Sequence, residues 1–575
     1  MRLPSPKSFG IFDRLFRFID TLRPLDRAIF FALLALFLIS LSISIYSVGR
    51  SFLVDIPVEG GTLIEGVIGS PRFINPVLAI TRADHDLVAL TYSGLLRLTP
   101  EGDLANDLAE SVTISEDGRV YNILLKQNVR FHDGVSVTAE DVAFTIGLIQ
   151  QPELKSPIRG NWSGVVVEVI GPYELNLVLE NPYTPFRENL TVGILPRHIW
   201  STLTEEELPF SQHNIEPIGS GPYRVESVER NAAGLVSEYD LHAFESNDSK
   251  ANIENIIIRF YQNEDEVMEA FEGGEITSTA ALSERSLTDI DAEKYDLVSE
   301  SLPRVFAVFL NQNRHPILRD PAVRKALQES IDKDALIENA LGGFGVATDS
   351  PLPAGFFETT PDSLSGEDRL AKARATLEAG GWTRHDDGIY RKTIDDQLQP
   401  LRFTVRSGNG PLFERAAENL TATWRSLGAE VTFEFYEQSD LVQTIIRPRD
   451  YQALLFGMDI GRSLDLYPFW HSSSREDPGL NVSLYANINV DSLVTKMRVA
   501  TSTEERDRLI GEFAEEIKND MPAIFLFSPS FEYAVVKEVK TTEFKKIQRP
   551  SERWSNVESW YMHESGVWPI FTNNN

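Results

Sequence analysis

The stretch LRFTVRSGNGPLFERAAENLTATWRSLGAEVTFEFYE, residues 401–437, indicates the fold class of this chain. Residues 401–408 and 431–437 are rich in β-branched and aromatic side chains, which favour strands. Between them, residues 411–427 form a predicted helix that ends at Gly428, where a left-handed backbone is needed. Because this helix passes directly into the second strand, the pattern predicts an α/β fold.

The same alternation of strand and helix signals continues through the chain. Further strands are predicted at residues 121–131, 173–180, 255–261 and 523–529. A helix over residues 367–379 is expected to end at Gly380, again in the left-handed conformation. Two helix starts are marked by caps: Thr138 precedes a run to about Ile149, and Asp320 precedes a proline at the first helical position.

Composition limits the classes of partner. The chain has 575 residues, a length that predicts several domains or lobes. It carries 85 Asp and Glu against 54 Lys and Arg, which gives a net charge of −31. This excess of acid argues against nucleic acid as a partner, because binding phosphates needs a basic face. The absence of cysteine excludes disulfides, thiolate metal sites and an N-terminal cysteine that accepts lipid.

An uncharged apolar run, residues 28–49, lies near the N-terminus between Arg27 and Arg50. At about 1.5 Å per residue, a helix of this length spans roughly 30 Å, the thickness of a bilayer core. The run is longer than the apolar region of a secretory signal peptide, and SIYSVG is a poor cleavage site. We therefore expect an uncleaved transmembrane helix; a cleaved signal is the alternative.

The tail before this run, residues 1–27, sets the expected orientation. It contains more basic than acidic groups, and basic flanks stay cytoplasmic. A short amphipathic helix in the inner membrane interface is predicted by the spacing of Phe9, Phe12, Leu15, Phe16 and Ile19, with an unstructured tail as the alternative. The sequence thus predicts a single-pass protein of the cell membrane with its large part on the extracytoplasmic side.

Signatures of catalysis are missing from the sequence. It contains no H-E-x-x-H, no G-x-x-x-x-G-K-[ST], no G-x-S-x-G and no EF-hand loop. The nine histidines never fall three or four residues apart, so no zinc site is predicted on a helix face. Paired acids are frequent, but in so acidic a chain such pairs are usually solvated. We expect no enzyme activity, no metal site and no cofactor.

Four segments carry a specific set of motifs. They are LAESVTISEDGRVYNILLKQNVRFHDGVSVTAEDVAFTI (108–146), IGSGPYRVESV (218–228), FAVFLNQNRHPILRDPAVRKALQESIDKDAL (306–336) and DYQALLFGMDIGRSLDLYPFWHSSS (450–474). In this order they resemble the family 5 extracytoplasmic solute-binding proteins, the peptide- and nickel-binding components of ABC importers. Most motif residues are expected to be structural: Asp133-Gly134 suits a turn with positive φ at the glycine, and Gly221-Pro222 suits a rigid bend.

The resemblance implies a two-lobed fold of the periplasmic-binding-protein type II, with an extra subdomain. The first lobe would contain residues 58–300 plus 525–575, with residues 101–214 as its inserted subdomain. The second lobe would contain residues 305–522. Two hinge crossings would then fall near residues 302–304 and 527–529, where a few residues absorb the change in dihedral angles.

The resemblance also suggests where a ligand would be held. An α-ammonium enclosed between lobes needs a carboxylate, because an unpaired buried charge is costly. In peptide-binding members of the family, an Asp after a buried strand supplies it, and here Asp459 follows ALLFGM directly. Asp465 is the competing candidate, and both could instead be ordinary loop acids.

Several other side chains could line the same cleft. The aromatic candidates are Tyr92, Trp162, Phe456 and Trp470, each of which could equally belong to a core. Arg304, beside the predicted hinge, could meet a ligand carboxylate; Arg447 and Arg449 are the alternatives.

The resemblance implies a monomeric, membrane-anchored binding protein that captures oligopeptides and delivers them to ABC permease subunits with cytoplasmic ATPases. The same fold could bind another solute, such as a nickel chelate or an oligosaccharide. It could also serve sensing or envelope structure without transport, and a surface hydrolase is a third class.

Overall fold

The computed structural model describes residues 18–567, except residues 20, 22, 52, 246–249, 289, 354–363, 501 and 542–544. The chain forms two units, one of residues 1–59 with 562–575 and one of residues 60–561. Most of the predicted tail, residues 1–27 with its amphipathic helix, therefore lies outside the described residues.

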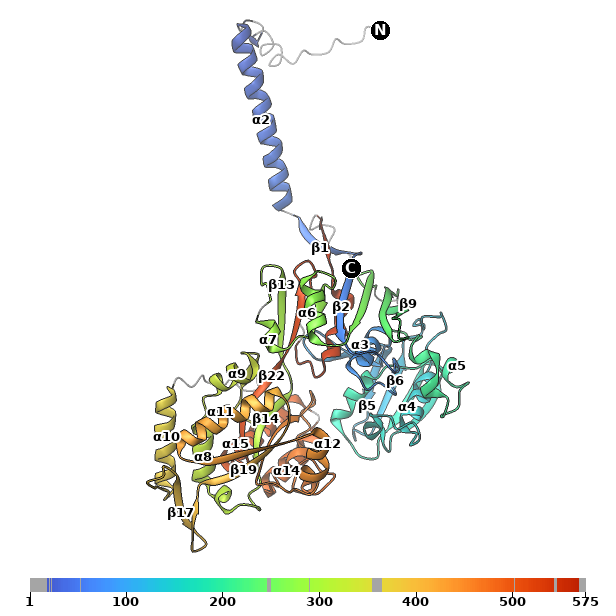
Figure 1. Cartoon of the computed structure of the whole chain (residues 1–575). Helices are drawn as coiled ribbons and strands as arrows, with labels where there is room; N and C mark the ends of the chain where they lie inside the picture. Colours follow the sequence, from blue (N-terminus) through green and yellow to red (C-terminus); the bar gives the residue numbers. More distant parts are fainter. Residues whose placement is uncertain are drawn as a thin grey trace, which may run out of the picture. The chain divides into compact units, whose positions relative to one another are not determined.

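The first unit contains the apolar helix. Helix α2 covers Pro24–Ser51, and its stretch Pro24–Ser44 is long and apolar enough to cross a membrane. It is followed by strand β1 (Val54–Val58), which pairs antiparallel with β23 (His563–Val567). We expected residues 563–567, near the C-terminus, in the first lobe. In the structure they pair with the strand that follows the apolar helix (Figure 1).

The second unit is built on one sheet of twelve strands. Its main path runs β20-β19-β21-β14-β22-β12-β2-β11-β10-β9, and β13 and β15 also pair with β22. The strands are β2 (Thr62–Ile68), β9 (Tyr223–Arg230), β10 (Val236–Ala243), β11 (Asn255–Tyr261), β12 (Ser278–Thr279), β13 (Tyr295–Ser301), β14 (Arg304–Leu310), β15 (Gly345–Ala347), β19 (Arg402–Gly408), β20 (Glu430–Tyr436), β21 (Ala453–Asp459) and β22 (Ala523–Val536).

Strand β22 joins the two halves of this sheet. Its first residues pair with β14, and its residues from Ser530 onward pair with β13 and β12. The predicted strand at 523–529 is therefore only the first part of a longer strand. The other connection is short, since β13 ends at Ser301 and β14 begins at Arg304. We call residues 60–301 with 530–561 the first lobe, and residues 304–527 the second lobe.

The second lobe has apolar cores on both faces of its sheet. Along β14, Phe306, Val308 and Leu310 belong to one core and Val305, Ala307 and Phe309 to the other, as alternation along a strand requires. Helices on the first face are α8 (Pro321–Glu329), α9 (Lys333–Leu341), α10 (Gly366–Ala379) and α11 (Pro411–Leu427); those on the second are α14 (Ile488–Val499) and α15 (Thr503–Asp520). A small sheet of β16 (Thr383–Arg384), β17 (Tyr390–Ile394) and β18 (Gln397–Pro400) completes the lobe.

The helix caps of this lobe test the sequence predictions directly. The Asp320 carboxylate accepts the backbone N–H of Ala322 at 2.9 Å, so the predicted cap of α8 is confirmed. Gly428 ends α11 with φ of 110°, also as predicted. The prediction of a left-handed Gly380 is wrong, because this residue has φ of −77° and the next glycine, Gly381, has φ of 83°. The turn is completed one residue later than expected.

The first lobe adds helices α3 (Arg82–Thr91), α6 (Glu264–Glu272) and α7 (Glu284–Leu287) to its part of the sheet. It also contains β3 (Leu96–Leu98) and β4 (Leu104–Asn106). A subdomain holds a four-stranded sheet ordered β5-β6-β8-β7, with β5 (Ala109–Ile114), β6 (Val120–Leu125), β7 (Val166–Gly171) and β8 (Glu174–Val178). Helix α4 (Ala139–Gln150) follows the predicted cap at Thr138, and α5 spans Arg197–Trp200. The strand predicted to reach residue 131 ends at Leu125, since the chain turns at Gln127-Asn128.

His132 joins two of the sequence motifs that are far apart in the chain. Its Nε2 lies 3.0 Å from the carbonyl of Gly221, and its Nδ1 accepts the backbone N–H of Gly219 at 3.3 Å. The neighbouring Gly134 has φ of 90°, which confirms the predicted turn. Burial, with a smaller contribution from Arg224, lowers the pKa of His132 to about 4. Protonation would put a hydrogen on Nδ1, facing the N–H of Gly219.

This neutral histidine predicts acid sensitivity. Between pH 6.5, the ordinary pKa, and about 4, the unfolded chain binds a proton at His132 that the folded chain does not. Stability should therefore fall as the pH is lowered through this window, with a contribution of about 1 kcal/mol per pH unit. Urea unfolding of the full chain at several pH values measures this effect. The free energy of unfolding should depend less on pH in His132→Asn than in the unmodified protein, whereas His385→Asn, at an exposed position, should show the same pH dependence as the unmodified protein. Equal slopes for His132→Asn and the unmodified protein would contradict this assignment.

Candidate functional site

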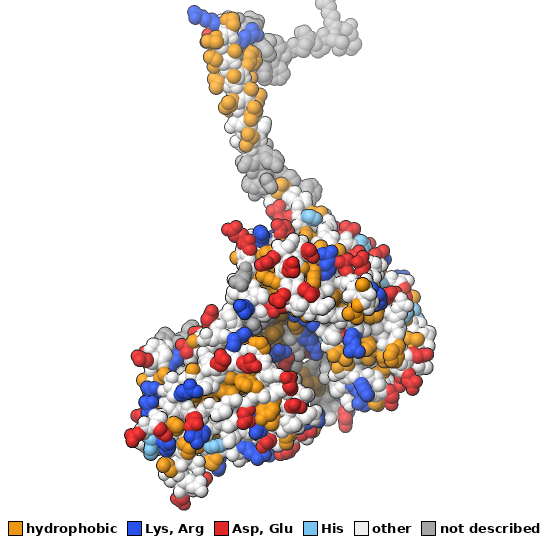
Figure 2. Space-filling model, in the orientation of Figure 1, with side chains coloured by type: hydrophobic (Ala, Val, Ile, Leu, Met, Phe, Trp, Pro, Cys, Tyr) orange, Lys and Arg blue, Asp and Glu red, His pale blue; other side chains and the backbone are white. Residues whose placement is uncertain are grey.

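A cavity of about 890 Å³ lies between the two lobes. Its first-lobe wall comes from residues within 160–189, and Gln548 and Arg549 add to it. Its second-lobe wall comes from residues within 459–467 and 495–499. Figure 2 shows the hollow between the lobes. The volume falls within the range of typical ligand sites, about 300–1,000 Å³.

Asp459 lies on the wall of this cavity, at the last position of β21. Its side chain is 44% exposed, so solvent or a ligand can reach the carboxylate. One oxygen accepts a hydrogen bond from Arg304 at 3.0 Å, and the other accepts the backbone N–H of Gly461 at 3.3 Å. Arg304 and Asp459 are direct partners in the pairing of β14 with β21. The structure thus brings two predicted residues together, with Arg304 beside the acid and outside the cavity wall.

Asp465, the competing acid, makes a different set of contacts. Its two oxygens accept hydrogen bonds from Arg498 at 2.9 and 2.7 Å, and the hydroxyl of Tyr183 donates to it at 3.0 Å. The guanidinium also stacks on Tyr467, 4.0 Å from the ring centroid. Since Tyr183 belongs to the first lobe and the other groups to the second, Asp465 connects the lobes. Its carboxylate is 10% exposed and is already paired.

The contact between Tyr183 and Asp465 predicts an effect on lobe closure. Removal of the hydroxyl in Tyr183→Phe should shift the equilibrium toward separated lobes by about fivefold, since a hydrogen bond of this kind contributes about 1 kcal/mol. Because the chain has no cysteine, dyes can be placed at Glu206→Cys and Arg508→Cys, one on each lobe, for single-molecule energy transfer. Tyr467→Phe is the control, since its hydroxyl contacts Ser473 in the same lobe. An unchanged distance distribution in Tyr183→Phe would show that the contact does not hold the lobes.

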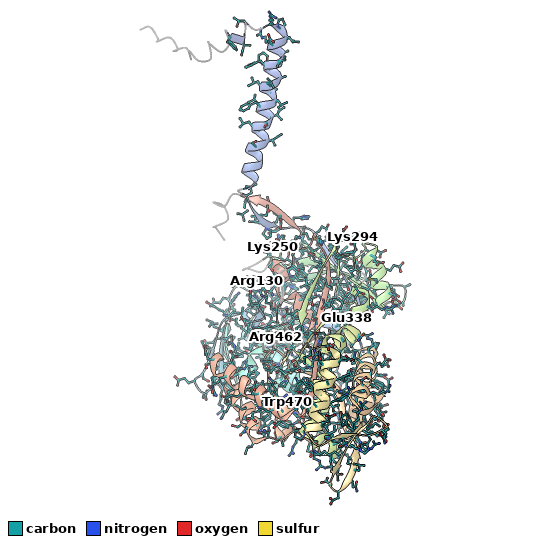
Figure 3. All side chains as sticks on the ribbon, turned by 90° about the vertical axis from the view of Figure 1, so that its left-hand side faces the viewer. Arg130, Lys250, Lys294, Glu338, Arg462 and Trp470 are labelled. Atoms are coloured by element: carbon teal, nitrogen blue, oxygen red, sulfur yellow. The ribbon has the colours of Figure 1, made fainter. Side chains whose placement is uncertain are left out.

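None of the predicted aromatic residues lines the main cavity. Trp470 (Figure 3) is fully buried in the second-lobe core against Phe309 and Phe525. Phe456 packs on the same core. Tyr92 is buried in the first lobe and borders a separate pocket of about 170 Å³. Trp162 is buried too, but it borders a second interlobe cavity of about 270 Å³. These rings are placed mainly by the apolar area they remove from water.

The second cavity adjoins the first. Both are bordered by Asn161, Glu188, Asn189, Gln548 and Arg549. Sequence reasoning missed these residues, as well as Tyr183 and Arg498. The only local signal was the polar loop NPYTPFRENL, residues 181–190, directly after a predicted strand. That loop forms the short helix η2 (Thr184–Thr191), which supplies Glu188 and Asn189.

Glu188, on the walls of both cavities, has a shifted pKa. Burial raises its pKa to about 7; Arg462 and Arg506 act in the opposite direction, and Glu552 adds to the rise. Arg462 reaches the cleft from the second lobe and is paired with Glu552 at 2.5 Å (Figure 3). Among the described residues, no group of three His, Asp or Glu side chains could hold a metal ion.

Comparison with known proteins identifies the family. Residues 103–479, more than half of the chain, match the bacterial extracellular solute-binding proteins, family 5, middle region. The chain belongs to this family. Its members among the curated relatives are oligopeptide-, dipeptide- and nickel-binding proteins of ABC transporters, so the resemblance recognised from the sequence motifs is confirmed.

Individual relatives are distant but cover most of the chain. The oligopeptide-binding protein AppA of Bacillus subtilis is 25% identical over 519 residues, 88% of this chain and 92% of that protein. The nickel-binding periplasmic protein of Escherichia coli is 26% identical over 410 residues, 67% of this chain and 72% of that protein. The structure of the ABC transporter substrate-binding protein CtaP from Listeria monocytogenes has a TM-score of 0.70 at 23% identity, covering 88% of this chain and 99% of that one. The shared fold is the two-lobed periplasmic binding protein, as predicted.

Proposed function

We propose that this protein is a membrane-anchored, extracytoplasmic binding protein that captures oligopeptides between its two lobes and delivers them to an ABC permease. The observation that carries the proposal is the carboxylate of Asp459, on the wall of a cavity of about 890 Å³ to which both lobes contribute. The family and the names of several relatives support a peptide as the ligand class.

The chemistry of the cavity suits a peptide. A protein that binds many peptides must recognise the backbone and the charged ends, because side chains vary. Asn161, Asn181 and Gln548 line the cavity and offer amide donors and acceptors to a peptide backbone. Asp459 is the acceptor we assign to the α-ammonium group. A charge-assisted hydrogen bond there contributes about 1.5–3 kcal/mol.

The N-terminal helix supports the anchored location. Helix α2 contains the uncharged run 28–49, and the basic tail before it favours a cytoplasmic N-terminus. The chain offers no cysteine for lipid attachment, so in this proposal the helix replaces the lipid. It also contains no phosphate-binding loop motif, so the energy for transport would come from the ATPases of the partner complex.

Native mass spectrometry tests the proposed ligand. The full chain is purified in detergent from cells grown in a peptide-rich medium, and its bound molecules are released and sequenced. We expect a heterogeneous set of short peptides, depleted when Asp459→Asn is purified in the same way. A nickel chelate, an oligosaccharide or no released ligand would overturn the peptide assignment. Retention in the membrane fraction after alkaline carbonate extraction tests the anchor, and full release would overturn that part.

A further inference from the structure

The two interlobe cavities meet at a charged junction. Glu188 and Arg549 both border the larger and the smaller cavity, so a ligand that fills one cavity and extends toward the other would pass these side chains. Glu188 comes from η2 on the first lobe, whereas Asp459 comes from β21 on the second. The larger cavity therefore presents carboxylates from both lobes to a bound molecule: Glu180 and Glu188 from the first lobe and Asp459 from the second.

Glu188 differs from Asp459, Asp465 and Glu552 in its partners. Asp459 pairs with Arg304, Asp465 pairs with Arg498, and Glu552 pairs with Arg462. Within the part of the chain that the structure describes, the carboxylate of Glu188 makes no hydrogen bond and no ion pair. Burying a carboxylate without a partner costs free energy. A ligand group with a positive charge at this point would therefore bind more tightly than a neutral group of the same size.

We propose that Glu188 is a second cation-binding subsite, which selects ligands that carry a positively charged side chain in addition to the group held by Asp459. This inference rests on the proposed peptide-binding function and adds the chemical class of the preferred ligand. Because the two acids belong to opposite lobes, a ligand with two cationic groups would connect the lobes, and its binding would favour closure.

Arginine side chains near Glu188 limit how strong this selectivity is. Arg462 is engaged by Glu552 and by the backbone carbonyl of Lys546, at 2.5 and 3.1 Å. Arg549 borders the same junction and is exposed, and the effect of Arg506 on the pKa of Glu188 is smaller than that of Arg462. These cations reduce the attraction for a ligand cation. We therefore expect a preference of about tenfold, below the effect expected at Asp459.

The protonation of Glu188 gives the subsite a pH dependence. Its pKa of about 7 means that the carboxyl is partly protonated near neutral pH. Binding of a cation would favour the charged form and release a proton, so the preference should grow as the pH rises from 6 to 8. The charged groups that face it are Arg462, Arg506, Arg549 and Glu552. His85 lies on the wall of the smaller cavity, and burial lowers the pKa of that histidine.

The test compares tripeptides that differ in one charge. Isothermal titration of the full chain in detergent uses Ala-Lys-Ala, Ala-Met-Ala and Ala-Ala-Ala, at pH 6 and 8. We expect Ala-Lys-Ala to bind about tenfold more tightly than Ala-Met-Ala at pH 8 and only a few-fold more tightly at pH 6. The α-amino groups of all three peptides exchange protons to the same extent near pH 8. Titrations in buffers of different ionisation enthalpy should therefore show more proton release for the lysine peptide than for the other two.

Two variants complete the experiment. Glu188→Gln should remove the preference for Ala-Lys-Ala over Ala-Met-Ala. Glu206→Gln, at an exposed first-lobe position outside both cavities, should behave like the unmodified protein. A lysine preference that survives in Glu188→Gln, or that is missing from the unmodified protein while all three peptides bind, overturns the subsite alone. Failure of all three peptides to bind overturns the proposed peptide function and the subsite with it.

Discussion

Replacing Arg553 by methionine is expected to lower the free energy of unfolding by about 3–5 kcal/mol, the usual cost of removing one partner from a buried ion cluster. Methionine approximates the length of the side chain, so the change removes the charge and its hydrogen bonds while leaving little empty space. The expected loss is a large fraction of the total stability of a typical domain, about 5–15 kcal/mol.

The geometry around Arg553 explains this magnitude. The guanidinium donates to both oxygens of Asp86 at 2.7 and 3.0 Å, and to Glu65 at 2.8 Å. All three side chains have 0% exposure. Burial disfavours the charge of Arg553, but Asp86 and Glu65 outweigh this effect and raise its pKa above the ordinary value. Removing the cation would leave two buried carboxylates facing each other.

The cluster also joins distant parts of the first lobe. Arg553 lies in η8 (Pro550–Ser559), Asp86 in α3 and Glu65 in β2. The hydroxyls of Ser278 and Tyr533 donate to Glu65 as well, at 2.5 and 3.0 Å. One side chain thus attaches the C-terminal segment to the sheet and to α3. Its loss should therefore loosen the segment that carries Gln548 and Arg549 to the cleft.

Urea unfolding of the full chain, followed by tryptophan fluorescence, measures the effect. The matched control is Arg508→Met, because Arg508 is 53% exposed and pairs with Glu505 and Glu512 on its own helix. Exposed pairs of this kind contribute little, so the control midpoint should stay close to that of the unmodified protein. Similar small shifts for the two variants would show that the buried cluster does not stabilise the lobe as we infer.

Asp459→Asn is expected to weaken the binding of a peptide with a free N-terminus by about 10- to 100-fold. Asparagine keeps the shape of the side chain and removes the charge, and the loss of a charge-assisted hydrogen bond corresponds to about 1.5–3 kcal/mol. The prediction rests on the proposed function. An N-acetylated peptide has no ammonium group, so its affinity should be weak and nearly the same for both proteins.

Arg304 provides an independent check on this assignment. Its guanidinium lies 3.0 Å from Asp459 and offsets the negative charge that would attract an ammonium group. Arg304→Met should therefore strengthen binding of the unmodified peptide severalfold, in the direction opposite to Asp459→Asn. Asp296→Asn, an exposed acid on β13 outside the cavity, controls for net charge and should leave affinity unchanged. Titration calorimetry with Ala-Ala-Ala and its acetylated form measures all of these. Equal affinity of Asp459→Asn and the unmodified protein would mean that another residue binds the α-ammonium group.

The local parts of the fold could be predicted from the sequence. The strand, helix and strand of residues 401–437 form β19, α11 and β20, with Gly428 at the predicted helix end. The cap at Asp320 and the turn at Gly134 also follow from the residues at those positions. Such features depend on side-chain periodicity and on backbone sterics within a few residues, which a sequence displays directly. Asp459 could be placed at the end of a strand for the same reason.

The tertiary structure alone decided which charges meet. Arg304 and Asp459 became neighbours through the register of β14 with β21, and Tyr183 reached Asp465 from the other lobe. Arg553 contacts Glu65 and Asp86, which lie more than 460 positions away in the sequence. These pairings depend on how the chain closes over long distances, about which neighbouring residues carry no information. For the same reason, Glu188 looked like one acid among 85 until the fold placed it between two cavities without a partner of its own among the described residues.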